Sequence, residues 1–157
     1  MALLVRSATL DDLPFLIEYN QRLAQETEGH ILDRTTLESG IRALLLDAHK
    51  GFYLVAEDTT TAEVVGQLQI TTEWSDWRNG WFWWLQSVYV AAHAREHGVF
   101  RMLFEAIEAQ ALTAGNVIGL RLYVDRDNDR AQRVYERFGM TQDHYLLFLK
   151  TFPESSK

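Results

Sequence analysis

The most constraining feature of this sequence is a strand–helix–strand pattern in its second half. An aromatic and apolar run over Trp81–Val90 leads through Gly98 into a helical pattern that continues to about Ala114. In Ile118–Val124, apolar side chains then alternate with others, which is typical of a strand that is buried on at least one face. A helix between two strands favours a parallel pair joined by a right-handed crossover. The chain is therefore expected to fold around a sheet that contains a parallel unit.

Further strands and helices are predicted around this unit. Two acidic residues and Pro14 mark the start of a first helix, as helix N-termini prefer. The predicted strands are Leu3–Ala8, Phe52–Glu57, Val64–Thr72 and Tyr145–Lys150, and the predicted helices are Thr9–Gln25, Thr36–Ala48 and Asp129–Phe138. This order of elements is that of an α+β fold, and without a repeat or a linker it predicts one domain over residues 1–157.

The composition excludes several classes of function. The chain has no cysteine, which excludes a disulfide framework, a zinc-thiolate site and a cysteine nucleophile. Its net charge is −7, from 22 acidic and 15 basic residues, which disfavours nucleic-acid binding and favours attraction of a cation. No stretch approaches the roughly 18 unbroken apolar residues of a membrane span, and no signal peptide is visible. We expect a cytoplasmic protein without nucleic-acid or membrane partners.

A first candidate site lies where the aromatic strand passes into the helix. The strand ends in Val88-Tyr89-Val90, and Arg95-Glu96-His97-Gly98 precedes the helix. The first N–H groups of a helix have no acceptor within it, and the helix dipole favours an anion. Gly98 permits close approach of a ligand and Arg95 adds positive charge, so a pyrophosphate would suit this loop. The alternative is an ordinary turn with a surface arginine.

A second candidate site follows the next strand. Asn128, Ala131, Tyr135 and Gly139 stand at the spacing Asn-x-x-Ala-x-x-x-Tyr-x-x-x-Gly. Asn128 can cap the helix or hold an amide of a ligand. Ala131 and Tyr135 share a helix face, which leaves room for a thin ligand beside a phenol. The alternative is a capped amphipathic helix with a core tyrosine.

Together the two sites resemble the GNAT superfamily of acetyl-CoA-dependent N-acetyltransferases. The coenzyme loop of that family reads Arg/Gln-x-x-Gly-x-Gly/Ala, which residues 95–100 match except at Phe100. Its second motif is matched over residues 128–139, with Met140 in place of a phenylalanine. The resemblance is strongest over roughly residues 81–145. It implies a mixed, mostly antiparallel twisted sheet of six or seven strands flanked by four helices, with the last strand pair shortened here.

The resemblance also implies where acetyl-CoA binds and how it reacts. The coenzyme enters a gap between the fourth and fifth strands, and no metal takes part. Tyr135 is implied as the acid that protonates the leaving thiolate, and the N–H of Val88 as the oxyanion donor. Phe100 must then point away from the ligand. The implied coenzyme-binding residues are Val88, Tyr89, Val90, Arg95, Glu96, His97, Gly98, Val99, Phe100, Arg101, Asn128, Ala131 and Tyr135.

The general base and the acceptor pocket are predicted from acidic and aromatic residues. Glu73 is the preferred base because it closes a strand, where its position is better fixed than in a loop. Glu26 and Glu28, between the first two helices, are the alternatives, and each acid could equally be a solvated loop residue. Trp74, Asp76 and Trp77 would complete a cage for an amine with these acids. His93 and His97 are expected to be exposed loop residues rather than metal ligands.

Three functions fit these residues. The first is acetylation of the primary amine of a small molecule. The second is acetylation of a protein N-terminus or lysine. The third is a CoA-binding module without catalysis, which Phe100 makes conceivable and the retention of Tyr135 opposes. A homodimer is one possible assembly.

Overall fold

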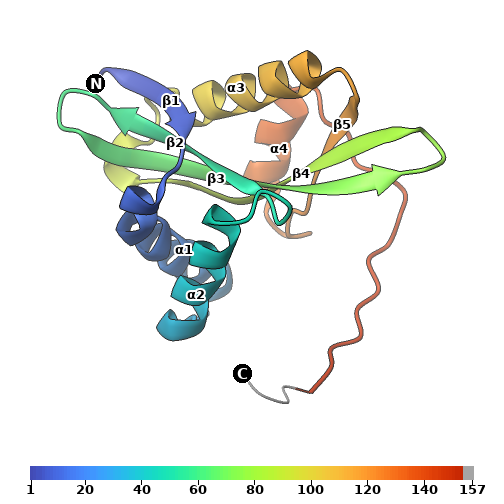
Figure 1. The fold of residues 1–157 in the computed structure, drawn as a ribbon, viewed down its shortest axis with the longest axis horizontal. Helices are drawn as coiled ribbons and strands as arrows, with labels where there is room; N and C mark the ends of the chain where they lie inside the picture. The colour runs from blue at the N-terminus through green and yellow to red at the C-terminus, as the bar shows by residue number, and fades with distance from the viewer. Residues whose placement is uncertain (154–157) are drawn as a thin grey trace. The chain divides into compact units, whose positions relative to one another are not determined.

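Five strands form one sheet in this computed structural model, which describes residues 1–153. Their order follows the chain from β1 to β5 (Figure 1). The first four strands pair antiparallel, and β4 and β5 pair parallel. Their bounds are β1 Leu3–Ser7, β2 Phe52–Asp58, β3 Glu63–Ser75, β4 Gly80–Val90 and β5 Val117–Leu122. The predicted α+β class, with a mixed and mostly antiparallel sheet, is confirmed.

Residues 1–153 contain four α-helices, as predicted. They are α1 Leu13–Glu28, α2 Arg34–Leu45, α3 Val99–Ala114 and α4 Asp129–Arg137, with short 3₁₀ turns η1 Leu10–Asp12 and η2 Ala92–Ala94. The chain divides into two compact units, Met1–Leu122 and the part from Tyr123 onward, and α4 belongs to the second. The single domain over residues 1–157 stays a prediction.

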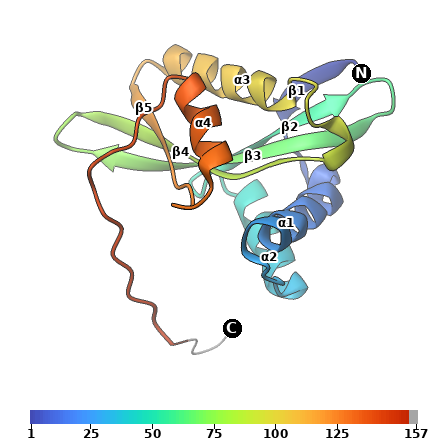
Figure 2. The ribbon, with the colours of Figure 1, turned by 180° about the vertical axis from the view of Figure 1, so that it is seen from behind.

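Within the first unit, helices cover both faces of the sheet. Figures 1 and 2 show α1 and α2 on one side and α3 on the other. A Cβ atom at Gly66 would lie 2.6 Å from a side-chain carbon of Val99, so the lack of a side chain lets α3 approach β3. On the opposite face, Asn20 of α1 donates a hydrogen bond to the Tyr53 hydroxyl of β2. The core residues with the least exposure include Leu16, Leu54, Leu68, Ile70, Leu103 and Ile107.

The predicted number of strands is wrong. Tyr145–Lys150, predicted as a last strand, forms no strand, and the sheet has five strands rather than six or seven. Extended backbone counts as a strand only when another strand accepts its hydrogen bonds. No strand within residues 1–153 pairs with this segment. The composition of this segment is typical of a strand, but composition does not identify another strand that pairs with it.

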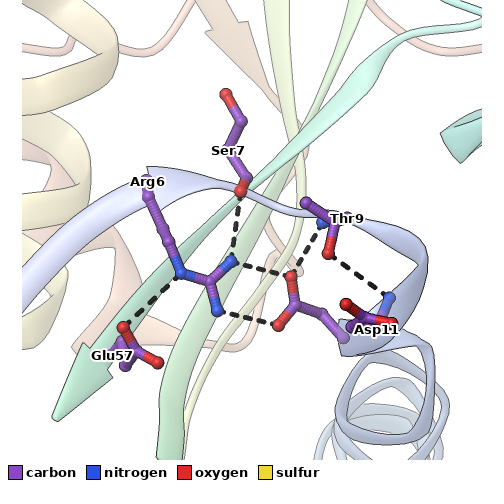
Figure 3. A network of polar contacts seen from close by, with 6 residues as sticks. Arg6, Ser7, Thr9, Asp11 and Glu57 are labelled. Carbon is purple, nitrogen blue, oxygen red and sulfur yellow. Dashed lines mark hydrogen bonds and ion pairs between the residues drawn. The ribbon is translucent and has the colours of Figure 1, made fainter. Parts of the chain in front are cut away.

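An arginine network fixes the junction between β1 and the first helices. Figure 3 shows the Arg6 guanidinium, which donates hydrogen bonds of 2.8 and 2.9 Å to the two carboxylate oxygens of Asp12 and also faces Glu57. The Asp12 carboxylate accepts from the Thr9 N–H as part of a capping box. Burial alone would raise the pKa of Asp12, but the bonds from Arg6 and Thr9 outweigh it and hold that pKa below its usual value.

Candidate functional site

The site is organised by a β-bulge in β4. Gln67 lies opposite Tyr89 and Gln69 opposite Gln86, so Ser87 and Val88 together face a single residue of β3. Ser87 has a positive φ of 51°, a conformation that is uncommon outside glycine. Bulges of this kind redirect backbone groups and often stand next to active sites. The bulge includes Val88, the predicted oxyanion donor.

Buried polar side chains support the bulge from the face that α1 and α2 cover. The Gln67 amide nitrogen donates to the Ser87 carbonyl oxygen at 2.9 Å. The Ser87 hydroxyl lies 3.4 Å from the Gln69 amide oxygen. Gln67 is fully buried, and its amide oxygen has no partner among residues 1–153. A buried acceptor without a partner costs stability, so this position is a feature of the bulge that needs an explanation.

Beside the bulge, one edge of β4 is open. The pairing of β4 with β5 covers only Trp81–Leu85, which meet Val117–Leu122. From Gln86 to Val90, β4 pairs with β3 but has no second strand on its other side within the described chain. An extended ligand can pair with exposed strand groups like an added strand. This is where the predicted ligands Val88 and Val90 lie.

The loop after β4 forms a concave set of backbone N–H groups. Glu96 and Gly98 both have positive φ, 68° and 77°, on either side of His97. Alternation of this kind turns successive N–H groups toward one point and makes an anion-binding nest. Gly98 is also the N-cap of α3 and provides no side-chain cap, so the first turn of α3 adds further N–H groups. The loop therefore suits a pyrophosphate.

Arg95 joins this loop to α1. Its guanidinium donates to the Val90 carbonyl oxygen at 3.0 Å and to the Glu26 carboxylate at 2.9 Å. The Tyr89 hydroxyl donates to the other carboxylate oxygen of Glu26, and the Arg95 guanidinium lies 5.3 Å from the centre of the Tyr89 ring. We call Glu26, Tyr89 and Arg95 the loop cluster. An open hollow of about 490 Å³ lies beside it, lined by Gln21, Arg22, Gln25, Glu26, Ile31, Tyr89 and Ala92.

The charges in the loop cluster are well defined. The hydrogen bond from Tyr89 and the contact with Arg95 hold the pKa of Glu26 below its usual value, although burial opposes this shift. Burial and the bond to Glu26 raise the pKa of Tyr89. The carboxylate therefore stays ionised and the phenol stays protonated. A carboxylate with a lowered pKa is a weaker base, so Glu26 is better suited to hold Arg95 than to take a proton.

A second carboxylate, Glu73, has partners of the same kind. It accepts a hydrogen bond of 3.0 Å from the Trp84 indole N–H and one of 2.8 Å from the Arg121 guanidinium. The Arg121 guanidinium lies 3.5 Å from the centre of the Phe82 ring. We call Glu73, Trp84 and Arg121 the hairpin cluster. It joins β3, β4 and β5 before β4 and β5 separate.

The two clusters stand on the same face of the sheet, on opposite sides of the bulge. Tyr89 lies opposite Gln67, and Trp84 lies opposite Thr71. Gln67 and Thr71 are four residues apart on β3, so they point to one face and are separated by about 13 Å along the strand. On this face of the sheet, one carboxylate therefore lies on each side of the bulge along the strands.

The remaining predicted acceptor residues do not join either acid. Trp74 alternates with Glu73 and so lies on the other face, where its ring packs against Trp81 at 5.0 Å. Asp76 and Trp77 lie in the turn between β3 and β4, and Trp77 is 88% exposed. Glu28 is exposed at the end of α1. Glu26 and Glu28 belong to α1 and Glu73 to β3, and a single amine cage of these acids and rings stays a prediction.

Three other residues considered in the sequence analysis, Phe100, His97 and His93, lie in or near this loop. The Phe100 ring packs against Phe104 at 5.9 Å between ring centres, so this bulky side chain packs along α3. The His97 ring nitrogen Nδ1 lies 2.9 Å from the Arg95 carbonyl oxygen of its own loop. His93 is exposed and lies 3.9 Å from Glu63. No cluster of three metal-ligating side chains occurs in residues 1–153, and no helix there is long and apolar enough to cross a membrane.

The second unit contains the other predicted motif. The Asn128 side-chain oxygen accepts from the Ala131 N–H at 3.1 Å, so Asn128 caps α4. Tyr135 lies on the same helix, four residues after Ala131. Burial raises the pKa of Tyr135, which keeps its phenol protonated at neutral pH.

Four residues of the site were not predicted. Trp84 and Arg121 hold Glu73, Ser87 is one of the two bulge residues, and Gln67 donates to the Ser87 carbonyl oxygen. Two of them could have been noticed in the sequence. Arg121 is a charged residue within an apolar strand, and Ser87 is a small polar residue within an aromatic strand. Neither signal identifies a partner across the sheet.

Comparison with known proteins supports the resemblance found in the sequence. Residues 13–140 match the model of the acetyltransferase (GNAT) family. A search of the curated proteins finds no match. A solved structure from Clostridium difficile 630, described as that of a possible acetyltransferase, has 40% identity and a TM-score of 0.91. The alignment covers 98% of this chain and 100% of that one.

More distant structures share the fold. A glucosamine-6-phosphate N-acetyltransferase from Arabidopsis thaliana has 16% identity and a TM-score of 0.74, with 98% of this chain and 100% of that chain covered. A predicted acetyltransferase from Clostridium acetobutylicum, solved with acetyl-CoA, has 15% identity and a TM-score of 0.75, with 94% and 96% covered. At these identities the likeness concerns the fold alone.

Proposed function

Because the chain belongs to the GNAT family of acetyltransferases, we propose that it transfers the acetyl group of acetyl-CoA to the primary amine of a small molecule. The amine attacks directly, while both substrates are bound. The observation that carries this proposal is the open edge of β4, which has the bulge at one end and the N–H nest of residues 95–98 beyond the other.

The loop fits the diphosphate of a coenzyme. The nest at Glu96 and Gly98 and the first turn of α3 offer several N–H donors. Arg95 adds a guanidinium that is 43% exposed. The part of β4 from Val88 to Val90, which β5 does not pair, suits the amides of an extended arm. Asn128 and Ala131, at the start of α4, are proposed as further contacts of the coenzyme.

Each proposed catalytic residue moves or holds a proton at a defined atom. Bound acetyl-CoA supplies a thioester, whose carbonyl carbon forms the new bond to nitrogen while its bond to sulfur breaks. Glu73 accepts the proton of the ammonium group, directly or through a water. The Val88 N–H stabilises the oxyanion. Tyr135 gives its proton to the sulfur, which its protonated phenol can do at neutral pH.

Charge favours an amine as the acceptor. The chain has a net charge of −7, which attracts cations over long range. Glu73 places a carboxylate on the face of the sheet where the hairpin cluster stands. The ring of Trp84 stands beside it and can contact an alkylammonium group. A small polyamine or amino sugar fits this set of groups.

The test is a turnover screen that follows thiol release from acetyl-CoA. Because the chain has no cysteine, the protein contributes no background to a thiol reagent. The panel contains polyamines, aminoglycosides, amino acids, glucosamine 6-phosphate and peptides with free N-termini or lysines. We expect release with at least one small amine. Release with peptides alone would make the chain a protein acetyltransferase, and CoA binding without any release would make it a non-catalytic module.

A further inference from the structure

One peptide unit of β4 has a special place in the bulge. It joins Ser87 to Val88, the two residues that together face a single residue of β3. Its carbonyl belongs to Ser87 and its N–H to Val88, the proposed oxyanion donor. A trans peptide is planar, and its C=O and N–H point in opposite directions. Whatever fixes the direction of the Ser87 carbonyl therefore also fixes the direction of the Val88 N–H.

The regular end of β4 shows which way this N–H should point. Just after the strand, the Ala91 N–H donates to the Val65 carbonyl oxygen of β3 at 2.8 Å. The Val90 carbonyl oxygen accepts from the Arg95 side chain. Successive residues of a strand alternate between its two sides, so in a regular strand Val88 would point away from β3, as Val90 does. The bulge interrupts the ladder here, so the ladder alone does not hold the Val88 N–H in that direction.

Gln67 supplies the missing support from β3. Its amide nitrogen donates to the Ser87 carbonyl oxygen at 2.9 Å. A carbonyl oxygen can only accept, so it is the nitrogen of the amide that must face it. The bond directs the Ser87 carbonyl toward β3, and the N–H of Val88 consequently points away from β3, to the open edge of β4.

Gln67 fills its position at a cost in stability. The side chain is fully buried, and its amide oxygen has no partner among residues 1–153. Val65 and Leu68 of the same strand are also buried and are apolar. A methionine would fill about the same space as Gln67 without burying an unsatisfied acceptor. Departures of this kind from the rules of core composition are expected at functional positions.

We propose that Gln67 is a positioning residue for acetyl transfer, which holds the Ser87 carbonyl and thereby directs the Val88 N–H toward the thioester oxygen of bound acetyl-CoA. This inference rests on the proposed function. Gln67 touches neither substrate and acts through one peptide unit. Its hydrogen bond also polarises that peptide, which makes the N–H a stronger donor. A donor that is already oriented needs no rearrangement when negative charge develops on the oxygen.

The first test is Gln67→Met, which keeps the length of the side chain and removes the donor. We expect kcat to fall about tenfold, with the Kd for CoA and the KM for the amine within about twofold of wild type. The midpoint of urea unfolding should change little, because one hydrogen bond and one unsatisfied acceptor are lost together. The control is Asp12→Asn, which loses buried bonds far from β4 and should be less stable with kcat within twofold. An unchanged kcat in Gln67→Met would overturn the proposal.

A second variant, Gln67→Glu, gives a readout in pH. An ionised carboxylate cannot donate to the Ser87 carbonyl, whereas a protonated carboxyl can. Burial raises the pKa of a carboxyl at this position, so the protonated form becomes accessible on mild acidification. We expect kcat of Gln67→Glu, divided by that of wild type at the same pH, to rise as the pH falls. A ratio that does not depend on pH would contradict the role of the donor.

A third measurement needs no turnover and so separates this inference from the proposed function. Acetyl-CoA that carries an isotopic label at its thioester carbonyl is bound without an amine, and infrared difference spectra record the carbonyl stretch. A hydrogen bond lowers this frequency, so we expect a lower value on wild type than on Gln67→Met. Equal frequencies would overturn the role of Gln67. The expected difference without transfer to any amine would keep it and reject the proposed function, whereas no binding of acetyl-CoA would reject both.

Discussion

The loop cluster and the hairpin cluster are built alike but are held differently. Each has a glutamate that accepts from an arginine and from the N–H or O–H of an aromatic residue of β4. Arg95 of the loop cluster lies in a loop and is 43% exposed, whereas Arg121 lies in β5 and is 26% exposed. Arg121 also packs closely on Phe82.

This difference separates two tasks. Arg95 lies in the loop after β4, and to turn toward a phosphate it would leave the Val90 carbonyl oxygen at the end of β4, the Tyr89 ring and Glu26. Arg121 is fixed by the sheet, so Glu73 is fixed with it. We propose that the loop cluster serves the coenzyme and the hairpin cluster serves the amine. The predictions below test this division, from the largest expected effect to the smallest.

Tyr135 should matter for chemistry and belongs to neither cluster. Tyr135→Phe removes the proposed acid, and general acids contribute typically ~10²–10⁴-fold. We expect kcat to fall by that amount and the Kd for CoA to stay within about twofold, since the phenol proton acts only as the thiolate develops. Steady-state kinetics and calorimetry measure the two values. An unchanged kcat would make Tyr135 a packing residue.

The two glutamates should differ in their pH profiles. A carboxylate acts as a base only when ionised, so kcat/KM falls on the acid side as the base is protonated. Glu73→Gln should lower kcat/KM about 10²-fold at neutral pH and remove that acid limb. Glu26→Gln should keep it, because the lowered pKa of Glu26 places its protonation at more acid pH. The reverse result would place the base in the loop cluster.

The nest should depend on Gly98. Gly98→Val forces a β-branched residue into φ +77° and puts its side chain over the N–H groups, where the glycine now leaves open space. We expect the Kd for CoA to rise about 30-fold, since hydrogen bonds to charged groups contribute roughly 2 kcal/mol. The matched control is Gly115→Val at the other end of α3, with φ +81° and the same open space. Equal losses in both variants would show strain rather than a binding site.

A third acid–arginine pair should affect stability alone. Asp12 is buried and bonded to Arg6 and Thr9, so Asp12→Asn should lower the free energy of unfolding by about 2 kcal/mol. The pKa of Asp12 is lowered by folding, so its contribution is full above the unfolded pKa and is lost as the pH falls through the folded one. Urea unfolding at pH 7 and pH 3 measures both effects. A difference between wild type and variant that is as large at pH 3 as at pH 7 would contradict this assignment.

Local patterns in the sequence predicted most of the fold. Alternation and glycine signals located the five strands and four helices, and the spacing from Arg95 to Gly98 located the nest. The partners across the sheet could not be predicted, because the pairs Glu73–Arg121 and Glu26–Arg95 depend on register and helix placement. The bulge at Ser87 depends on the count of residues between two paired positions. The strand at Tyr145–Lys150 was predicted from composition, which says nothing about its partner.

The most direct test of the division between the clusters compares Arg95→Gln with Arg121→Gln. Each variant loses one ion pair with a glutamate and the contacts of a guanidinium with aromatic rings, Tyr89 for Arg95 and Phe82 and Trp84 for Arg121. Calorimetry with CoA should give a Kd about tenfold higher for Arg95→Gln, or about 1.4 kcal/mol, and a Kd within twofold of wild type for Arg121→Gln. The KM for the amine should rise in Arg121→Gln only. Weaker CoA binding in Arg121→Gln with normal binding in Arg95→Gln would contradict the account.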